Sequence, residues 1–287
     1  MTDHADASEA VREAVLEAAD RIESNKKHLT DLDSAIGDAD HGANMSRGFG
    51  AVAERVAEMD DAEPHEIVKT VGTTIISEVG GAAGPLYGGS IMSASTALSE
   101  GVTAETSVAF AEAYLEKLTD RGDARVGDKT MVDALTPAVH TYKKSIEVDD
   151  LPPLAALAKA VDACERGVEY TVPLRARKGR ASYLDWRSVG HQDPGATSTL
   201  ILAEAILDIA AEHLEGDVDR DARDPAVITA EREGLDLSEA VEDGNGAPET
   251  DGGEDVPETD GGEDVPEMDG GRDVAGTDDD RDAAGSD

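Results

Sequence analysis

Residues 9–22 read Glu-Ala-Val-Arg-Glu-Ala-Val-Leu-Glu-Ala-Ala-Asp-Arg-Ile, and their apolar side chains recur at steps of three and four residues. On a helix of 3.6 residues per turn, this spacing gathers the apolar side chains on one stripe. Pro64 and the proline pair at 152–153 stand where two further helices are expected to start, because the first helical turn leaves its N–H groups unpaired. The same pattern covers seven further segments: roughly 44–59, 65–79, 88–99, 104–119, 129–146, 152–170 and 195–214.

Strands find little support in the sequence. Aromatic residues make up 3% of the chain, and runs of alternating apolar residues are short and few. The pattern therefore predicts an all-α fold of about eight helices, with one domain over residues 1–215. A domain of this size buries a substantial core. Residues 216–241 are expected to form a linker that has room for some helix.

From about Glu242 the composition changes abruptly. A nine-residue unit at 251–259 recurs directly after itself and then decays. Residues 236–287 hold 20 acidic and two basic side chains, so they bury too little apolar surface to offset their ordering entropy. Calcium-binding β-roll repeats need a regular apolar position and glycine spacing that this unit lacks. The sequence therefore predicts a disordered acidic tail at 242–287.

The chain contains 64 acidic and 25 basic residues, which gives a formal net charge of −39. A nucleic-acid-binding protein needs a positive face that displaces phosphate counterions, and an anionic membrane attracts the same kind of face. Neither partner is therefore expected. The most apolar late stretch, 200–214, contains Glu204 and Asp208, which a membrane-spanning helix would avoid.

Cys164 is the only cysteine, so an internal disulfide is excluded, and the first ten residues lack the basic-then-apolar pattern of a signal peptide. We expect a soluble, cytoplasmic protein. Because so acidic a surface repels itself in dilute solution and is tolerated where salt screens it, we also infer a cytoplasm rich in salt. Purified protein that kept its full helicity and stability without added salt would refute that inference.

Three carboxylates lie within eight residues, at Asp33, Asp38 and Asp40, and the chain is free to turn at Gly37 and Gly42. Carboxylate oxygens are the hard ligands that Mg²⁺ prefers, and clustered carboxylates repel one another unless a cation lies between them. A solvated acidic turn is the alternative, since such turns are common in a protein this acidic. A calcium-binding EF-hand is excluded, because the loop that starts at Asp38 has no glutamate at its twelfth position.

Residues 80–90 read Gly-Gly-Ala-Ala-Gly-Pro-Leu-Tyr-Gly-Gly-Ser. Glycines allow successive backbone N–H groups to point at an anion, and the helix that follows adds its positive end. A Walker A loop is excluded, because no Gly-Lys-Ser/Thr is present. A tight turn between helices explains this segment equally well. His41 of the acidic motif also has a structural alternative, as a cap of the helix that follows it.

Two further segments between helices carry polar or basic residues. In Gly127–Met131, Asp128 is expected to cap the next helix, and Met131 either packs in the core or contacts an aromatic base. Residues 176–180 hold three cations, which suit a polyphosphate, a partner's acidic patch or the protein's own acidic surface. At 193–195, Asp-Pro-Gly opens the last helix, with the aspartate as its cap.

Taken together, the four segments resemble the L subunit of dihydroxyacetone kinase, often written DhaL. The resemblance spans about residues 5–215 and follows the family's order and spacing. It rests on the motifs Ile36-Gly-Asp-Ala-Asp-His-Gly42 with Asn44, Gly80-Gly-Ala-x-Gly-Pro-Leu-Tyr-Gly88, Gly127-Asp-Lys-Thr-Met131, Ala176-Arg-Lys-Gly-Arg-Ala-Ser-Tyr-Leu184 and Gly190-His-Gln-Asp-Pro-Gly-Ala-Thr-Ser198. It implies a barrel of eight antiparallel helices, with ADP and two Mg²⁺ ions bound among the loops at one end. The acidic tail lies outside it.

The resemblance also implies the residues of the site. It makes Asp33, Asp38 and Asp40 the metal ligands. The nucleotide-binding positions fall on His41, Gly42, Ala43, Asn44, Ala82, Ala83, Gly122, Met131, Arg180, Asp193, Pro194 and Gly195. Relatives often carry serine where this chain has Ala83, so a hydroxyl contact to phosphate is missing, at a cost of about 1 kcal/mol.

The family contains two arrangements. Single-chain kinases fuse the substrate domain to this one and use exchangeable ATP, whereas stand-alone L subunits keep ADP as a bound cofactor. In the second arrangement, a phosphohistidine on the M subunit of the phosphotransferase system recharges the ADP to ATP. The γ-phosphoryl group then passes to dihydroxyacetone held on the K subunit. No K-like domain is present in this sequence, which favours the second arrangement.

Other functions stay open. An L subunit that uses exchangeable ATP to phosphorylate dihydroxyacetone or another small sugar would show the same motifs. Some L subunits bind transcription factors, so a regulatory role is a second alternative. The nucleotide domain of fatty acid kinase shares the barrel, but those proteins continue into further folded domains. The sequence leaves open whether the subunit forms a homodimer.

Overall fold

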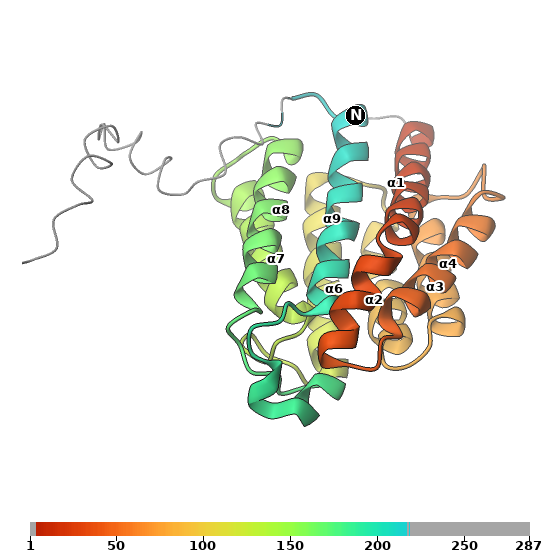
Figure 1. Cartoon of the computed structure of the whole chain (residues 1–287). Helices are drawn as coiled ribbons and strands as arrows, with labels where there is room; N and C mark the ends of the chain where they lie inside the picture. The colour runs from red at the N-terminus through yellow and green to blue at the C-terminus, as the bar shows by residue number, and fades with distance from the viewer. Residues whose placement is uncertain (1–3, 217, 219–287) are drawn as a thin grey trace, which may run out of the picture. The chain divides into compact units, whose positions relative to one another are not determined.

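The computed structural model describes residues 4–216 and 218, and every regular element within them is helical (Figure 1). These residues belong to one compact unit, Met1–Glu233, whereas a second unit, Gly234–Asp287, lies outside the described residues. The predicted tail at 242–287 and most of the predicted linker lie outside them as well.

The all-α prediction is confirmed for the described part of the chain. Its nine α-helices are α1 (His4–Ser24), α2 (Lys26–Ile36), α3 (His41–Val56), α4 (Pro64–Glu78), α5 (Gly89–Ala94), α6 (Ala104–Gly122), α7 (Met131–Glu147), α8 (Pro153–Tyr170) and α9 (Pro194–His213). A π-helical turn, η1 (Gly84–Gly88), precedes α5, and two 3₁₀ segments, η2 (Ser95–Leu98) and η3 (Arg180–Ser188), follow α5 and α8. The prediction of about eight helices was one too few, and the family's closed barrel of eight stays a prediction.

The helix that the apolar pattern did not reveal is α2. Residues 23–28 are all polar, so the three- and four-residue steps stop after Ile22 and resume only at Leu29. The chain turns at Asn25, whose Nδ2 donates a 2.9 Å hydrogen bond to a carbonyl near the end of α1. Ile22 and Leu29 are fully buried, and Ile36 is nearly so. A seven-residue spacing through these three residues therefore marks the buried face that continues from α1 into α2.

Helix α9 packs against α1, α7 and α8, and Figure 1 shows it between α8 and α1. Among the described residues, it is the one helix long and apolar enough to cross a membrane, and half of that stretch is buried. Its contacts with several helices account for the apolar composition, as in the core helix of a bundle. Around it, α7 pairs with α8, and α3 contacts both α1 and α4.

The main core cluster is formed by buried side chains of α1, α2, α3, α4, η1 and α9. Its fully buried side chains include Ile22, Leu29, Met45, Val52, Ile67 and Ile75. Full burial of one such side chain stabilises the fold by about 1.5–3 kcal/mol. Because Leu29 of α2 and Met45 of α3 share this cluster, the core also fixes how the two helices flank the turn between them.

Prolines start three helices, as the sequence predicted. Pro64 and Pro153 occupy first positions in α4 and α8, and Pro194 opens α9 directly after Asp193. Proline suits these positions because its fixed φ matches a helix and its missing N–H would have no helical partner.

Helix α7 contains a proline in its interior. Pro137 has no N–H to donate to the carbonyl four residues earlier, that of Asp133. A Cβ on Gly167 of α8 would overlap this carbonyl. The glycine therefore allows α8 to pack closely on α7 at the point where the helical ladder is interrupted.

Candidate functional site

The three carboxylates of the acidic motif converge at the turn between α2 and α3. One oxygen from each of Asp33, Asp38 and Asp40 lies within 4.8 Å of the others. Asp33 is buried near the end of α2, whereas Asp38 and Asp40 are exposed on the turn. In the described part of the chain, this group, called the acid cluster below, is the one whose spacing suits a metal ion.

The first turn of α3 holds Asp33 in place. Asp33 Oδ2 accepts hydrogen bonds from the backbone N–H groups of Asp40, at 2.8 Å, and His41, at 3.1 Å. A Cβ on Gly37 would overlap Asp33 Oδ1, so the close passage of chain and carboxylate needs glycine. Ala39 has φ +61°, in the left-handed region that costs a non-glycine residue about 1–2 kcal/mol. The turn is thus held in one unusual conformation that brings the carboxylates together.

One basic side chain reaches the acid cluster. Arg180 Nε, at the start of η3, lies 2.9 Å from Asp38 Oδ2. Both side chains are partly exposed, so solvent weakens this pair. Three carboxylates this close repel one another, and a divalent cation relieves the repulsion. The donor set fits Mg²⁺, which takes a few carboxylates and completes its shell with water or phosphate oxygens.

The glycine-rich segment lies beside the start of α3. A Cβ on Gly80 would lie 3.2 Å from Asn44 Oδ1. Arg47 secures this contact, since its Nη2 donates to Asn44 Oδ1 and its Nε to the Glu78 carbonyl, each at 2.9 Å. On the other side of α3, a Cβ on Gly42 would overlap a carbonyl of α2. The structure therefore brings the acidic motif and the glycine-rich segment together.

Further predicted nucleotide positions surround this segment. Ala43 is exposed on the first turn of α3, and Ala82 is exposed just before η1, where Ala83 is half-buried. Gly122 ends α6, and a Cβ there would lie 3.4 Å from Leu86 Cδ2 of η1. These contacts place the end of α6 beside the glycine-rich segment.

A buried hydrogen-bond network links the acid cluster to α9. Tyr87 of η1 donates to the Gly195 carbonyl at 2.9 Å, and its hydroxyl also lies 2.9 Å from Ser198 Oγ. Ser198 Oγ in turn lies 3.0 Å from His41 Nε2. Burial raises the pKa of Tyr87 to about 12. Burial also lowers the pKa of His41, although carboxylates of the acid cluster oppose this shift. Both shifts favour the neutral forms of these side chains, which connect α3, η1 and α9.

Asp193 caps α9, as predicted. Its Oδ2 accepts a 2.7 Å hydrogen bond from the Ala196 N–H, and its own N–H donates to Thr171 Oγ1 at 3.0 Å. Burial raises the pKa of Asp193 to about 7, although backbone hydrogen bonds oppose the shift. A Cβ on Gly195 would lie 3.3 Å from Met131 Cε, so the methionine lies against this turn.

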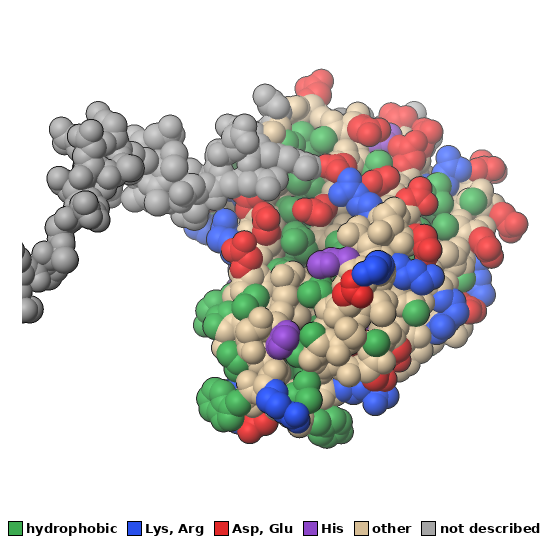
Figure 2. All heavy atoms as spheres, in the orientation of Figure 1, with side chains coloured by type: hydrophobic (Ala, Val, Ile, Leu, Met, Phe, Trp, Pro, Cys, Tyr) green, Lys and Arg blue, Asp and Glu red, His purple; other side chains and the backbone are tan. Residues whose placement is uncertain are grey.

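The basic segment pairs with acidic residues of this chain, as one of the three sequence-based alternatives predicted. The pairs are Arg175–Asp185 at 2.6 Å, Arg177–Asp128 at 3.9 Å, Lys178–Asp123 at 3.0 Å and Arg180–Asp38 at 2.9 Å. Tyr183 and Trp186 of η3 are highly exposed, and Arg175 stacks over the Trp186 ring at 5.0 Å. Figure 2 shows apolar and basic side chains together at the lower end of the unit, where η3 lies in Figure 1. Because solvent weakens exposed pairs, these cations can exchange partners.

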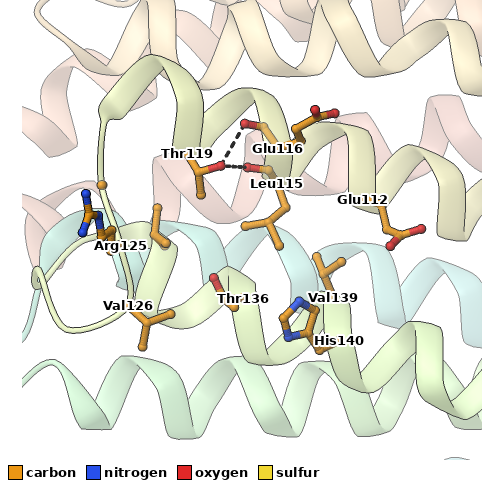
Figure 3. A pocket seen from close by; sticks show the side chains of 11 residues that line it. Glu112, Leu115, Glu116, Thr119, Arg125, Val126, Thr136, Val139 and His140 are labelled. Atoms are coloured by element: carbon orange, nitrogen blue, oxygen red, sulfur yellow. Dashed lines mark hydrogen bonds between the residues drawn. The ribbon is translucent and has the colours of Figure 1, made fainter.

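A separate hollow of about 450 Å³ lies between α6 and α7 (Figure 3). Its lining residues are Glu112, Leu115, Glu116, Thr119, Ala124, Arg125, Val126, Val132, Thr136, Val139 and His140. None of the predicted site residues is among them. The hollow is therefore distinct from the acid cluster and the segments around it.

Sequence reasoning assigned no role to two buried residues near this site. Tyr87 and Lys129 both stand inside motifs quoted above, and both are almost completely inaccessible to solvent. Helical periodicity does not predict burial of a residue between helices. The available signs were a lone tyrosine in a glycine-rich stretch and a lysine next to Asp128, which the sequence had predicted as the cap of α7. That prediction was wrong, because the cap is Thr130, whose hydroxyl accepts a hydrogen bond from the Val132 N–H.

Comparison with known proteins agrees with this arrangement. A protein-family model described as the DAK2 domain matches residues 35–208, from just after Asp33 into α9. A solved structure of the dihydroxyacetone kinase from C. freundii in complex with AMP-PNP and Mg2+ matches with a TM-score of 0.54. The match has 23% identity and covers 69% of this chain and 33% of that one, so it shows a shared fold.

Two bacterial relatives match over most of their length. The chain is 43% identical over 189 residues to the PEP-dependent dihydroxyacetone kinase 1, ADP-binding subunit DhaL, of Listeria innocua, which covers 66% of this chain and 89% of that protein. It is 40% identical over 199 residues to the corresponding DhaL subunit of Escherichia coli, which covers 67% of this chain and 92% of that protein. An L-erythrulose 1-kinase of Mycolicibacterium smegmatis is 32% identical over 220 residues, but only 37% of that protein is covered.

Proposed function

The chain belongs to the DAK2-domain family and, within it, to the DhaL subunits of dihydroxyacetone kinase, and on that premise we propose that it carries ADP and two Mg²⁺ ions for phosphoryl transfer. The convergence of Asp33, Asp38 and Asp40 beside the glycine-rich segment is the observation that carries this proposal. Bound Mg²⁺ would offset the negative charge on phosphate oxygens, which is the main catalytic need of phosphoryl transfer.

The residues of this chain have distinct parts in the proposal. The acid cluster holds the ions. The first turn of α3, from His41 to Asn44, and the backbone at Ala82 and Ala83 lie against the phosphates, and Arg180 adds a charged donor. Gly122, Met131 and the turn at 193–195 complete the nucleotide site. Met131 suits an adenine ring because a thioether packs favourably on aromatic surfaces.

No side chain of this subunit acts as a nucleophile in the proposal. A phosphohistidine on an M subunit supplies the phosphoryl group, and dihydroxyacetone bound to a K subunit receives it, giving dihydroxyacetone phosphate. The two bacterial relatives are ADP-binding subunits of PEP-dependent kinases, which supports this division of labour. This chain then contributes orientation and electrostatic stabilisation.

A second candidate is an L subunit that uses exchangeable ATP on dihydroxyacetone or another small sugar. The similarity to an L-erythrulose 1-kinase supports this second candidate. A regulatory DhaL-like protein is a further alternative, and transfer to a K subunit would exclude the purely regulatory form.

Mass analysis of nucleotide in the purified, desalted protein tests the proposal. Tightly retained ADP, converted to ATP by a phosphorylated M subunit, is the expected result. A site that is empty after desalting and fills only with added ATP would support the second candidate instead. Protein that binds neither nucleotide in the presence of Mg²⁺ would contradict both.

A further inference from the structure

Lys129 is a buried cation on the connection between α6 and α7. Its exposed fraction is 1%, and its backbone has φ +63°. Its Nζ donates hydrogen bonds to two main-chain carbonyls, those of Thr171, at 2.6 Å, and His191. These carbonyls stand at the two ends of residues 171–191, called the basic loop below, which carry Arg180 and lead directly into the cap of α9.

The two ends of the basic loop lie side by side. The Gly190 N–H donates to the Val172 carbonyl at 2.8 Å, and the Asp193 N–H donates to Thr171 Oγ1 at 3.0 Å. Each of these hydrogen bonds joins the start of the loop directly to its end or to the turn just after it. Lys129 differs from them, because it joins both ends of the loop to a separate connection of the fold.

A lysine is well suited to this place. Its ammonium has three donors on a flexible stem, so one side chain can serve two carbonyls at once. Burial lowers the pKa of Lys129, and the carboxylates of Asp193 and Asp133 oppose that shift. Burial of a cation and a left-handed backbone both cost free energy. The two hydrogen bonds and the nearby carboxylates are the interactions that offset these costs.

The neighbours of Lys129 belong to the nucleotide site. Thr130, the next residue, caps α7 by accepting a 3.1 Å hydrogen bond from the Val132 N–H. Met131 follows and lies against Gly195. Lys129 therefore stands where three predicted nucleotide-binding elements meet: the start of α7, the turn that opens α9, and the loop that carries Arg180.

We propose that Lys129 is a positioning residue that holds the basic loop closed at its base, so that Arg180 and the turn at 193–195 stay in place for the nucleotide. The part that concerns the nucleotide rests on the proposed function. The part that concerns the loop does not, because it follows from contacts within the protein. The two parts can be measured separately.

Hydrogen–deuterium exchange of the full chain without nucleotide measures the loop directly. Lys129→Met removes both donors at similar side-chain length, and Lys129→Arg keeps a charged donor. Lys69→Met, on the exposed face of α4, is the matched control. We expect Lys129→Met to speed exchange at residues 172–190 by about tenfold or more, with α1 and α3 unchanged. Lys129→Arg should restore much of the protection, and Lys69→Met should behave as the wild type.

Titration calorimetry with ADP and Mg²⁺ measures the second part. Lys129→Met should raise the Kd for ADP by about tenfold, which corresponds to about 1.4 kcal/mol. Exchange at 172–190 equal to that of the wild type, or acceleration spread evenly over all helices, would overturn the proposal. If the methionine variant does not fold, Lys129→Gln, which is too short to reach both carbonyls, decides by the same criterion. Wild-type protein that binds no ADP, with the exchange contrast intact, would support the loop tie and refute the proposed function.

Discussion

Arg180 Nε lies 2.9 Å from Asp38 Oδ2, so the basic loop directly contacts the acid cluster across 142 positions of sequence. The guanidinium is placed either to neutralise Asp38 or to bind a phosphate oxygen next to it, because arginine offers several donors to both kinds of group. This ion pair connects two segments that, from the sequence, only the family resemblance assigned to the same site.

Loss of the Asp38 carboxylate should abolish nucleotide carriage. We expect Asp38→Ala to release ADP and Mg²⁺ and to stop phosphoryl transfer, while the helical fold survives because Asp38 lies on an exposed turn. Nucleotide stoichiometry by mass analysis and helicity by circular dichroism are the measurements. Asp31→Ala is the control, since Asp31 is an exposed acid of α2 that pairs with Lys27. ADP retained at normal stoichiometry in Asp38→Ala would refute the metal assignment.

A methyl group at Gly37 should have the same effect by steric means. Gly37→Ala places a Cβ on Asp33 Oδ1 and so displaces a predicted ligand. Gly50→Ala is the matched control, because a Cβ on Gly50, which is exposed in α3, meets nothing within 4 Å. We expect Gly37→Ala to weaken Mn²⁺ binding at least about tenfold. Gly50→Ala should keep normal binding and gain about 0.5–1 kcal/mol in free energy of unfolding, because alanine favours a helix more than glycine does. Equal metal affinity in the two variants would contradict the prediction.

The Tyr87 hydroxyl should stabilise the end of the unit that holds the site. It donates to the Gly195 carbonyl and lies within hydrogen-bond distance of Ser198 and Thr199. We expect Tyr87→Phe to lower the free energy of unfolding by about 1–2 kcal/mol, measured by urea denaturation. Tyr183→Phe, which alters a hydroxyl on a highly exposed side chain, should change it by less than about 0.5 kcal/mol. Similar values for the two variants would show that the buried network contributes little.

A serine at position 83 should strengthen nucleotide binding. Ala83 lies half-buried at the start of η1, where the family resemblance implies a serine hydroxyl that contacts phosphate. Ala83→Ser should lower the Kd for ADP about fivefold, which corresponds to about 1 kcal/mol for one hydrogen bond. Ala57→Ser, at the exposed end of α3, should leave the Kd unchanged. Weaker ADP binding by Ala83→Ser in calorimetry would show that the phosphate does not lie beside η1.

Asp193 should make the protein less stable as the pH rises towards neutrality. Its pKa in the folded state is about 7, above the value of about 3.9 expected when unfolded, so unfolding releases a proton. The stability from this proton is complete below about pH 4 and is lost as the pH rises through about 7. Other carboxylates have their own pH dependence, so only a comparison with a neutral residue isolates this effect.

Asp193→Asn supplies that comparison, because asparagine stays neutral and can still accept the hydrogen bond that caps α9. Urea denaturation should show that Asp193→Asn gains stability relative to the wild type between about pH 5 and 7, by at most about 1.4 kcal/mol per pH unit. A difference that stays constant over that range would contradict the raised pKa.

The sequence predicted those parts of the fold that depend on local pattern. Steps of three and four residues located the long helices, and Pro64 and Pro153 marked two of their starts. Helix α2 was missed because the polar residues 23–28 interrupt those steps. Its contacts with α3, for example where Gly42 meets a carbonyl of α2, lie outside the three- and four-residue pattern.

In the site, too, the sequence predicted what depends on local pattern and missed what depends on tertiary contacts. Asp33, Asp38 and Asp40 are close in sequence, so their convergence could be predicted from composition and turn residues. Tyr87 and Ser198 are 111 positions apart, and their hydrogen bond exists only because η1 packs on α9. Burial of a polar residue between helices therefore depends on tertiary packing that single-sequence reasoning does not supply.

The central claim concerns the acid cluster, and anomalous scattering from crystals grown with ADP and Mn²⁺ tests it most directly, since Mn²⁺ takes the same oxygen ligands as Mg²⁺. We predict two anomalous peaks, bounded by the carboxylates of Asp33, Asp38 and Asp40 on one side and by the diphosphate on the other. A diphosphate bound elsewhere, or no peak within coordination distance of these three side chains, would contradict the account.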